Sequence, residues 1–379
     1  MNLPWAFSVL IMPLIGIKYF YAAAMFRRIT LFVLIFSGSF LSAQNYDTNY
    51  IAKYPSRLVL GIYQSWRQFD IQIRDIYKQD SIIVGQDTLK FNPLIGYKAD
   101  ANHATGISFD YDIIGFSLDY RSVAENDPVK YGKTTYSSFA VNFNSKGLRF
   151  ENSYRRYTGF YDYYSGSYTL SDTLYQNSSM SLLQLRSRII YFFKNRKFSL
   201  SSAYANTARQ LKSAFTWTLQ GGVYGTTFHS DTGLFPEPRK VHYDSTMRDW
   251  NGLRIIGVNA GGGLAFNLVA WKRVYFSLLL NGMFEYQHKK YSTEQSSFSN
   301  FGAISFANDS RVSVGYNAPR FFMRFAFRID KLVYESKSKD VTVDHKYWLF
   351  EGSLGYRFKM KTPGFYRKFQ ETKFYQRWF

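Results

Sequence analysis

Apolar and polar side chains alternate with a period of two along most of the chain between Ser56 and Lys359, and this pattern constrains the fold most strongly. One run places apolar side chains at every second position: Phe321, Met323, Phe325, Phe327 and Ile329. Successive side chains of a β-strand point to opposite faces, so the period predicts strands with one apolar and one polar face. Before residue 360 no helical periodicity extends beyond about two turns. The sequence therefore predicts an all-β fold.

The length of the alternating runs and the composition of their two faces indicate a membrane barrel. The runs are roughly 9–15 residues long, which is enough for a tilted strand to cross a bilayer. One face is rich in Phe, Leu and Tyr and the other carries Arg and Asp, which fits lipid outside and a polar lumen inside. A sheet edge in hydrocarbon has no hydrogen-bond partner, so the sheet must close. We predict a single transmembrane up-and-down antiparallel β-barrel in the cell outer membrane, with a soluble secreted β-protein as the alternative.

The number of strands follows from the hairpin rhythm of short turns and long polar segments. Counting hairpins over residues 56–359 predicts about 12 strands, within a range of roughly 10 to 14. Bacterial barrels place their long loops at one end, but this count puts segment 229–252 at the end with the short turns. Either that segment is a periplasmic excursion, or the count is wrong near residues 207–214.

Both ends of the chain differ from the barrel sequence. Residues 1–43 are predicted to be a signal region, because basic residues after Met25 precede an apolar run that ends at Ser42-Ala43. Met25 is then the expected true start, and an N-terminal membrane anchor is the alternative. Residues 44–55 form a short segment before the barrel. Residues 360–379 are predicted to be a separate basic, aromatic tail at the inner-leaflet interface or on a partner, with a frayed tail as the alternative.

The chain carries 47 Lys and Arg against 27 Asp and Glu, a formal net charge of +20. A barrel with a signal region does not fit nucleic-acid binding, so we predict no nucleic-acid partner. Some of the Lys and Arg side chains are predicted to lie at the rim, where they would bind phosphates of lipopolysaccharide. Others are predicted to line the lumen. The candidates for lining the lumen are Asp110, Asp112, Asp119, Arg121, Arg186, Arg188, Glu285, Arg320, Arg324, Arg328, Glu351 and Arg357.

Three of these arginines recur every four residues along one predicted strand: Arg320, Arg324 and Arg328. An arginine facing lipid at mid-depth costs roughly 2–4 kcal/mol, so these side chains are predicted to face inward. Arginines on one face repel each other, so they need acidic partners. We expect Glu351 on the next strand and Asp70 on the first strand to supply them.

No catalytic, cofactor or metal motif is found. The five histidines have no metal-ligand spacing, and no G-x-S-x-G or phosphate-binding loop is present. His229 and His242 share a loop with several acids, but an ordinary polar loop is the favoured interpretation. We predict no enzyme activity, no cofactor and no metal site. A barrel lipid hydrolase, which would need a Ser–His pair on the outer wall, is a remote alternative.

Several stretches resemble a known family: residues 57–63, the hairpin from Phe143 to Tyr161, and residues 196–199 leading to 210–214. The family is the uncharacterised outer-membrane barrel family of Gram-negative bacteria named domain of unknown function forty-four twenty-one. The resemblance spans nearly all of residues 56–359. It implies the barrel fold and the outer membrane, and it implies no activity.

The function expected from these observations is an outer-membrane barrel that passes or binds small solutes, anionic ones in particular. The alternative is a non-conducting structural or partner barrel in an envelope complex, whose interior is filled by salt bridges. The expected partners are outer-membrane lipid, lipopolysaccharide, the barrel assembly machinery and an envelope protein.

Overall fold

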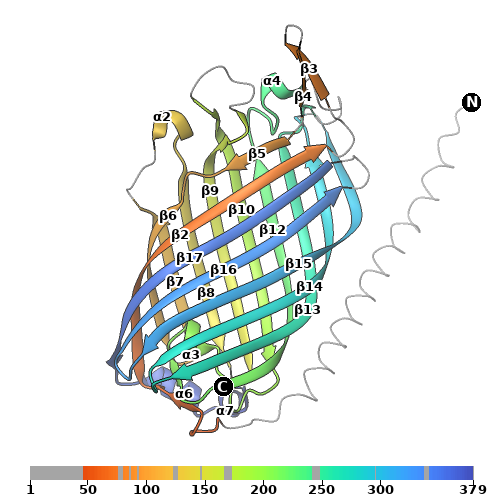
Figure 1. The fold of residues 1–379 in the computed structure, drawn as a ribbon. Helices are drawn as coiled ribbons and strands as arrows, with labels where there is room; N and C mark the ends of the chain where they lie inside the picture. Colours follow the sequence, from red (N-terminus) through yellow and green to blue (C-terminus); the bar gives the residue numbers. More distant parts are fainter. Residues whose placement is uncertain are drawn as a thin grey trace, which may run out of the picture.

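The computed structural model describes residues 46–75, 80–84, 87–91, 94–122, 127–145, 147–165, 173–240, 248–294, 296–336 and 341–378. Within these residues the chain forms a closed antiparallel β-barrel of twelve wall strands (Figure 1). The predicted fold class and strand number are therefore confirmed. The predicted signal region, residues 1–43, lies outside the described residues.

Each wall strand pairs with its two neighbours along the chain, and β17 pairs with β2 to close the barrel. Lys359 of β17 lies opposite Arg57 of β2, and Val341 lies opposite Asp75, so the closing ladder runs the full length of both strands. The wall strands are β2 (Arg57–Asp75), β6 (His103–Tyr111), β7 (Ile114–Arg121), β8 (Thr135–Asn144), β9 (Leu148–Asp162), β10 (Tyr175–Phe192), β12 (Ala214–His229), β13 (Gly252–Ala270), β14 (Val274–Ser292), β15 (Ser297–Asn317), β16 (Phe321–Ser336) and β17 (Val341–Lys359).

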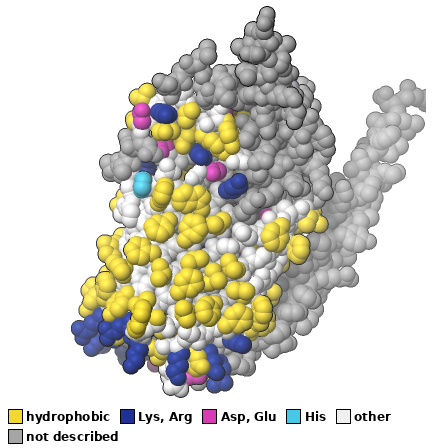
Figure 2. All heavy atoms as spheres, viewed as in Figure 1, with side chains coloured by type: hydrophobic (Ala, Val, Ile, Leu, Met, Phe, Trp, Pro, Cys, Tyr) yellow, Lys and Arg dark blue, Asp and Glu magenta, His cyan; other side chains and the backbone are white. Residues whose placement is uncertain are grey.

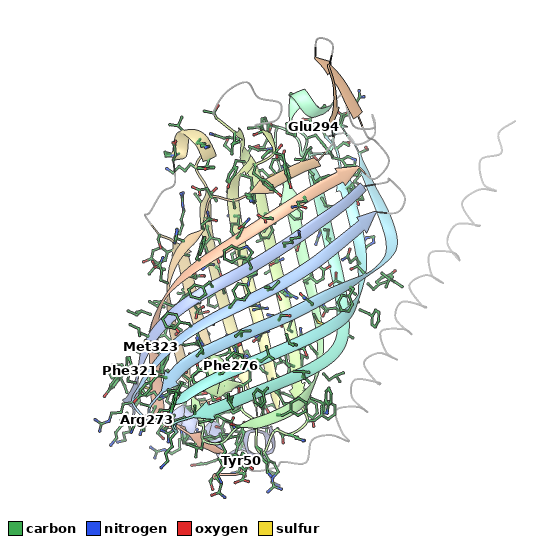
Figure 3. The ribbon with its side chains drawn as sticks, in the orientation of Figure 1. Tyr50, Arg273, Phe276, Glu294, Phe321 and Met323 are labelled. Carbon is green, nitrogen blue, oxygen red and sulfur yellow. The ribbon has the colours of Figure 1, made fainter. Side chains whose placement is uncertain are left out.

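The two ends of the barrel differ in their connections. We call the end with the short turns the turn end; residues 112–113, 145, 147, 271–273 and 318–320 lie there. Trp271 and Lys272 both have positive φ, 46° and 64°, which is the backbone of a type I′ turn between twisted strands. The opposite end is the loop end, and it carries Glu294, as Figure 3 shows, together with the hairpin of β3 (Asp80–Val84) and β4 (Asp87–Phe91).

The connection between β10 and β12 resolves the difficulty with the strand count. Residues 193–213 leave the wall at the turn end and return to the same end, so they add no membrane-crossing strand. They contain α3 (Ser201–Tyr204) and β11 (Ala208–Gln210), and β11 pairs with β1 (Ile51–Lys53) of the N-terminal segment. Segment 229–252 therefore lies at the loop end with the other long connections. The error in the count was near residues 207–214: the connection between β10 and β12 lies at the turn end, and the connection between β12 and β13 lies at the loop end.

An additional strand fills a gap at the loop end of the wall. The strand β5 (Leu94–Lys98) pairs with β2 through Asp70–Arg74 and with β9 through Tyr97 and Lys98. At this end β5 bridges β2 directly to β9, because β6, β7 and β8, which separate them elsewhere, pair only with the parts of β2 and β9 nearer the turn end. The small α-helices α2 (Pro128–Tyr131) and α4 (Glu237–Lys240) also lie at the loop end.

The outer face of the wall is apolar over a broad band. Figure 2 shows apolar side chains across the middle of one face and Lys and Arg gathered at the turn end. Phe321 and Met323 are 43% and 37% exposed, whereas Phe322 between them is 2% exposed, which fixes the outward positions of β16. No helix among the described residues is long and apolar enough to span a membrane.

The tail begins after β17 and is helical. It contains α6 (Gly364–Gln370) and α7 (Lys373–Trp378), which lie at the turn end near the C-terminus (Figure 1). Asp112 in the β6–β7 turn accepts hydrogen bonds from the hydroxyl of Tyr366 at 3.0 Å, from Nε2 of Gln370 at 3.1 Å and from the hydroxyl of Tyr375. Burial and the nearby Asp112 carboxylate raise the pKa of Tyr366. The tail is therefore attached to the barrel, and its predicted place at a leaflet or on a partner stays a prediction.

Candidate functional site

The interior of the barrel is the candidate site, and it is filled in three layers. The first layer, at the loop end, is an apolar cluster. Its wall residues include Phe69, Tyr157 and Phe160, with ring centroids 5.1 Å apart for Phe69 and Tyr157. The connection after β12 adds Phe235 and Trp250, and Trp250 stacks on Tyr291 at 4.2 Å. These rings occupy the space that an open channel would need at this end.

The second layer is an ion network at mid-height, which joins opposite walls. We define the central ion network as Glu151, Arg186, Arg188, Asp309, Arg311, Arg328 and Asp330. Arg311 on β15 binds both carboxylate oxygens of Glu151 on β9, at 2.6 and 2.7 Å. Five strand-to-strand steps separate β9 from β15 in the wall, so this pair crosses the lumen.

In the rest of the central ion network, two arginines of β10 pair with acids on β9, β15 and β16. Arg188 lies 2.9 Å from Glu151 and 2.8 Å from Asp309. Asp330 on β16 lies 3.2 Å from Arg186 and 2.9 Å from Arg328. Desolvating one such charge costs several kcal/mol, so each charge depends on its partners. The network joins β9 and β10 to β15 and β16 across the lumen.

The third layer, at the turn end, is the connection between β10 and β12. We call residues 194–213 the plug. Wall side chains hold its carbonyl groups: Nδ2 of Asn317 donates to Ser202 at 2.8 Å, and Nε of Arg357 donates to Asn206 at 2.6 Å. Phe198 and Leu200 of the plug pack with Phe192 of β10 in a second buried apolar cluster. The sequence of the plug is mostly small or polar, and side chains of the wall bind several of its carbonyl groups.

Arg324 connects the plug to the central part of the interior. Its Nη1 donates to the carbonyl of Tyr204 at 2.9 Å, and its Nη2 pairs with Glu351. The ring of Tyr204 lies 5.9 Å from the guanidinium of Arg324 and 6.0 Å from that of Arg311. Arg324 is thus both an ion-pair partner of the wall and a donor to the plug.

A polar chamber of about 200 Å³ lies between the loop-end cluster and the plug. Seven arginines line it against four acids. The arginines are Arg67, Arg149, Arg155, Arg188, Arg311, Arg324 and Arg328, and the acids are Asp110, Asp119, Glu151 and Glu351. Arg67 pairs with Asp119 on β7. The chamber is therefore a space inside the barrel whose lining carries more arginines than acids.

The structure places ten of the twelve predicted lumen residues inside the barrel. Arg186, Arg188 and Arg328 belong to the central ion network, and Arg324 pairs with Glu351 as expected. The others are Asp110 and Asp119 in the chamber lining, Arg357 at the plug, Arg121, which lies 3.2 Å from Asp100, and Glu285, which accepts from Tyr224 at 2.6 Å.

Two of the predicted lumen residues lie elsewhere, and one predicted partner is wrong. Arg320 is exposed in the turn before β16, because the strand begins at Phe321 and the alternation carries no information beyond it. Asp112 lies in the β6–β7 turn with φ 49° and binds the tail. Asp70 is on the outward face of β2, where its carboxylate accepts from Gln68 at 2.8 Å.

Sequence reasoning missed several charges that complete the interior: Arg67, Arg149, Glu151, Arg155, Asp309, Arg311 and Asp330. Asp309 and Arg311 stand two residues apart, as do Arg149 and Glu151, so the same period of two contained the signal. The alternation does not show which strands face each other across the lumen. Within the described residues no group of three or more His, Asp or Glu side chains could hold a metal ion.

These features define a class: a closed transmembrane-type β-barrel with a filled, arginine-rich interior. A family model described as Domain of unknown function (DUF4421) matches residues 45–358. The chain therefore belongs to this family, and the resemblance found in the sequence is confirmed. No curated protein sequence matches the chain.

Among solved structures, the chain is similar to the outer membrane protease OmpT from Escherichia coli, at 8% identity and a TM-score of 0.34, over 84% of this chain and 100% of that one. The toluene transporter TodX of P. putida is 8% identical with a TM-score of 0.26, over 81% and 91% of the two chains. A FadL homologue of Pseudomonas aeruginosa is 10% identical with a TM-score of 0.23, over 81% and 93%. Scores this low carry no argument about activity.

Proposed function

We propose that the protein is an outer-membrane barrel that is closed at rest and does not conduct. In this arrangement the turn end faces the periplasm and the loop end faces outward, as in bacterial barrels with long external loops. The single observation that carries the proposal is the filling of the interior by three layers in series. Opening the loop-end cluster alone, or displacing the plug alone, would leave the central ion network across the path.

The rims of the barrel support outer-membrane lipid as a partner. At the turn end, exposed cations stand beside outward aromatic residues, as in Trp271-Lys272-Arg273 and Phe358-Lys359. Aromatic rings with adjacent Lys and Arg are typical of a membrane interface with anionic headgroups. Near the loop end, exposed Arg254 and Lys290 lie directly opposite each other on β13 and β14, which suits phosphates of lipopolysaccharide.

The tail supports an envelope partner for the closed barrel. Arg367, Lys368 and Lys373 are exposed on α6 and α7, and Phe365 is 78% exposed. A basic surface with an exposed aromatic ring suits an acidic periplasmic partner or the leaflet itself. The assembly machinery remains an expected partner of the chain during insertion.

A second candidate is the binding or slow passage of small anionic solutes. It is favoured by the excess of arginine around the chamber and by the polar attachment of the plug to the wall. In this alternative the plug would move away from Asn317 and Arg357 to admit a solute from the periplasm. Both candidate functions are compatible with the same strand pattern. They differ in whether ionic current flows through the barrel.

Conductance across a planar bilayer tests the proposal. The full chain should show no stable single-channel current, because the three layers block the lumen. A variant in which residues 198–211 are replaced by a short Gly-Ser linker should still be silent, since the central ion network remains. Adding Arg311→Ala and Arg188→Ala to that variant, together with Phe235→Ala and Trp250→Ala in the loop-end cluster, should produce a stable current, because all three layers are then opened. Stable current from the unaltered chain would overturn the closed barrel and favour the second candidate.

A further inference from the structure

We propose that the chamber binds one small oxyanion, such as phosphate or a short carboxylate, and that Arg155 is its principal ligand. The inference rests on the closed interior proposed above, and it assigns a ligand class to the chamber within it. It begins from the balance of charge around this space.

The interior around the chamber holds more positive than negative charge. Eight arginines stand there: Arg67, Arg149, Arg155, Arg186, Arg188, Arg311, Arg324 and Arg328. Six acids stand with them: Asp110, Asp119, Glu151, Asp309, Asp330 and Glu351. Two positive charges are therefore left over among these side chains. Uncompensated buried charge is strongly unfavourable, so a bound anion would stabilise the folded barrel.

Arg155 is the arginine of this lining that has no carboxylate within ion-pair distance among the described residues. It is 8% exposed, its Nη1 lies 3.4 Å from Oε1 of Gln184, and its guanidinium lies 4.1 Å above the Tyr347 ring. The other six lining arginines each contact an acid. A planar guanidinium held on an aromatic ring is well arranged to bind an oxyanion with two parallel hydrogen bonds.

Other buried donors around the chamber also lack an acceptor in the described structure. The hydroxyl of Tyr204, on the plug, has no hydrogen-bond partner there, and neither has Nε of Arg67 or Nε of Arg324. These unpaired donors belong to lining residues of both the wall and the plug, and the atoms themselves are buried beside the chamber. Ordered water can satisfy single donors, but it does not neutralise the surplus charge.

The size of the chamber limits the ligand. Sites for drug-sized ligands occupy roughly 300–1,000 Å³, and this chamber is smaller. The space suits a single oxyanion with a few waters, and it is too small for an oligosaccharide or a lipid.

The test compares two adjacent arginines on β9 that point in opposite directions. Arg155 faces the chamber, and Arg156 is exposed on the outer wall. The full chain and the variants Arg155→Met and Arg156→Met are refolded in detergent with phosphate, with acetate, or with sodium chloride at equal ionic strength. The midpoint of thermal unfolding is read from the heat-modifiable gel band, and retained phosphate is measured after desalting.

Phosphate or acetate should raise the unfolding midpoint of the unaltered chain and of Arg156→Met, and about one phosphate should remain bound after desalting. For Arg155→Met the midpoint should not respond, and retained phosphate should fall at least tenfold. Arg155→Lys keeps the positive charge but loses the planar guanidinium, so it should retain an intermediate amount of phosphate. This variant keeps the test decisive if Arg155→Met does not fold.

Equal responses of Arg155→Met and Arg156→Met would overturn the inference. So would an unaltered chain that oxyanions stabilise no more than sodium chloride does, which would mean that water alone fills the chamber. Failure here leaves the closed barrel intact, because closure is judged by conductance. A conducting chain that still binds phosphate through Arg155 would overturn the closed barrel and keep the anion site.

Discussion

Arg311 and Glu151 form a two-pronged ion pair across the lumen, with nitrogen–oxygen distances of 2.6 and 2.7 Å. They belong to β15 and β9, which are far apart around the wall, so the pair connects opposite sides of the barrel. Nε of Arg311 also lies 2.9 Å from Asp309, which Arg188 binds from β10. The interior is therefore held together by charge inside a wall whose outer face is apolar.

Replacing Glu151 by Gln should destabilise the barrel, because three arginines lose their shared carboxylate: Arg149, Arg188 and Arg311. Breaking a buried ion pair typically costs about 3–5 kcal/mol. The measurement is the free energy of unfolding in urea with the protein in lipid vesicles. Glu371→Gln, at an exposed position of the tail, is the control and should change stability little. An unchanged stability for Glu151→Gln would contradict the role given to the network.

Arg324→Leu should loosen the plug, because Arg324 binds Glu351 and the carbonyl of Tyr204 at once. The expected result is faster proteolysis within residues 194–213 of the folded protein, together with a lower unfolding midpoint. Phe325→Leu is the matched control, since Phe325 is 44% exposed on the lipid face and an apolar substitute is mild there. Equal protection of the plug in both variants would show that the wall does not hold it through Arg324.

Gly261→Ala should destabilise the contact between β13 and β14. A Cβ at this position would collide with the backbone of Gly282 and Met283 on β14. Overpacking of this kind typically costs about 1–3 kcal/mol. Gly225→Ala on β12 is the control, because a Cβ there has no atom within 4 Å. The unfolding midpoints of the two variants in the same detergent give the comparison, and a neutral Gly261→Ala would refute the close approach.

Asp112→Gly should release the tail from the barrel. Glycine tolerates the positive φ of this turn position, so the change removes the acceptor of Tyr366, Gln370 and Tyr375 without adding backbone strain. Trypsin should then cut after Arg367 and Lys368 several times faster, while the heat-modifiable band stays in place. A tail that is cut at the same rate in both proteins would mean that Asp112 does not hold it.

The sequence predicts the wall of this barrel well and its interior only in part. A period of two assigns each side chain of a strand to a face, which is why the alternation alone places Arg324 and Arg328 inward. In a turn, the alternation no longer indicates which face a side chain occupies. Arg320 and Asp112 lie in turns, and for this reason they were wrongly predicted to line the lumen. The pairing of Glu151 with Arg311 could not be predicted, because residues 160 positions apart meet only after closure.

The plug illustrates the same limit. Residues 194–213 contain the polar and small residues of an ordinary connection, and their strand-like part near 207–214 disturbed the strand count. What makes them a plug is the set of wall side chains that bind their carbonyl groups, Asn317 and Arg357 among them. Those contacts are set by the curvature of the closed sheet and not by the local sequence.

The closed interior can be tested most directly with single cysteines, because the natural chain has none. Ala326 lines the chamber, and Ser296 is exposed at the loop end. The measurement is the rate at which a charged, membrane-impermeant maleimide modifies Ala326→Cys and Ser296→Cys in the folded, reconstituted protein. We predict rapid modification of Ser296→Cys and protection of Ala326→Cys until the barrel is unfolded by heat. Modification of both at the same rate in the folded protein would contradict it, since the chamber would then be open to the reagent.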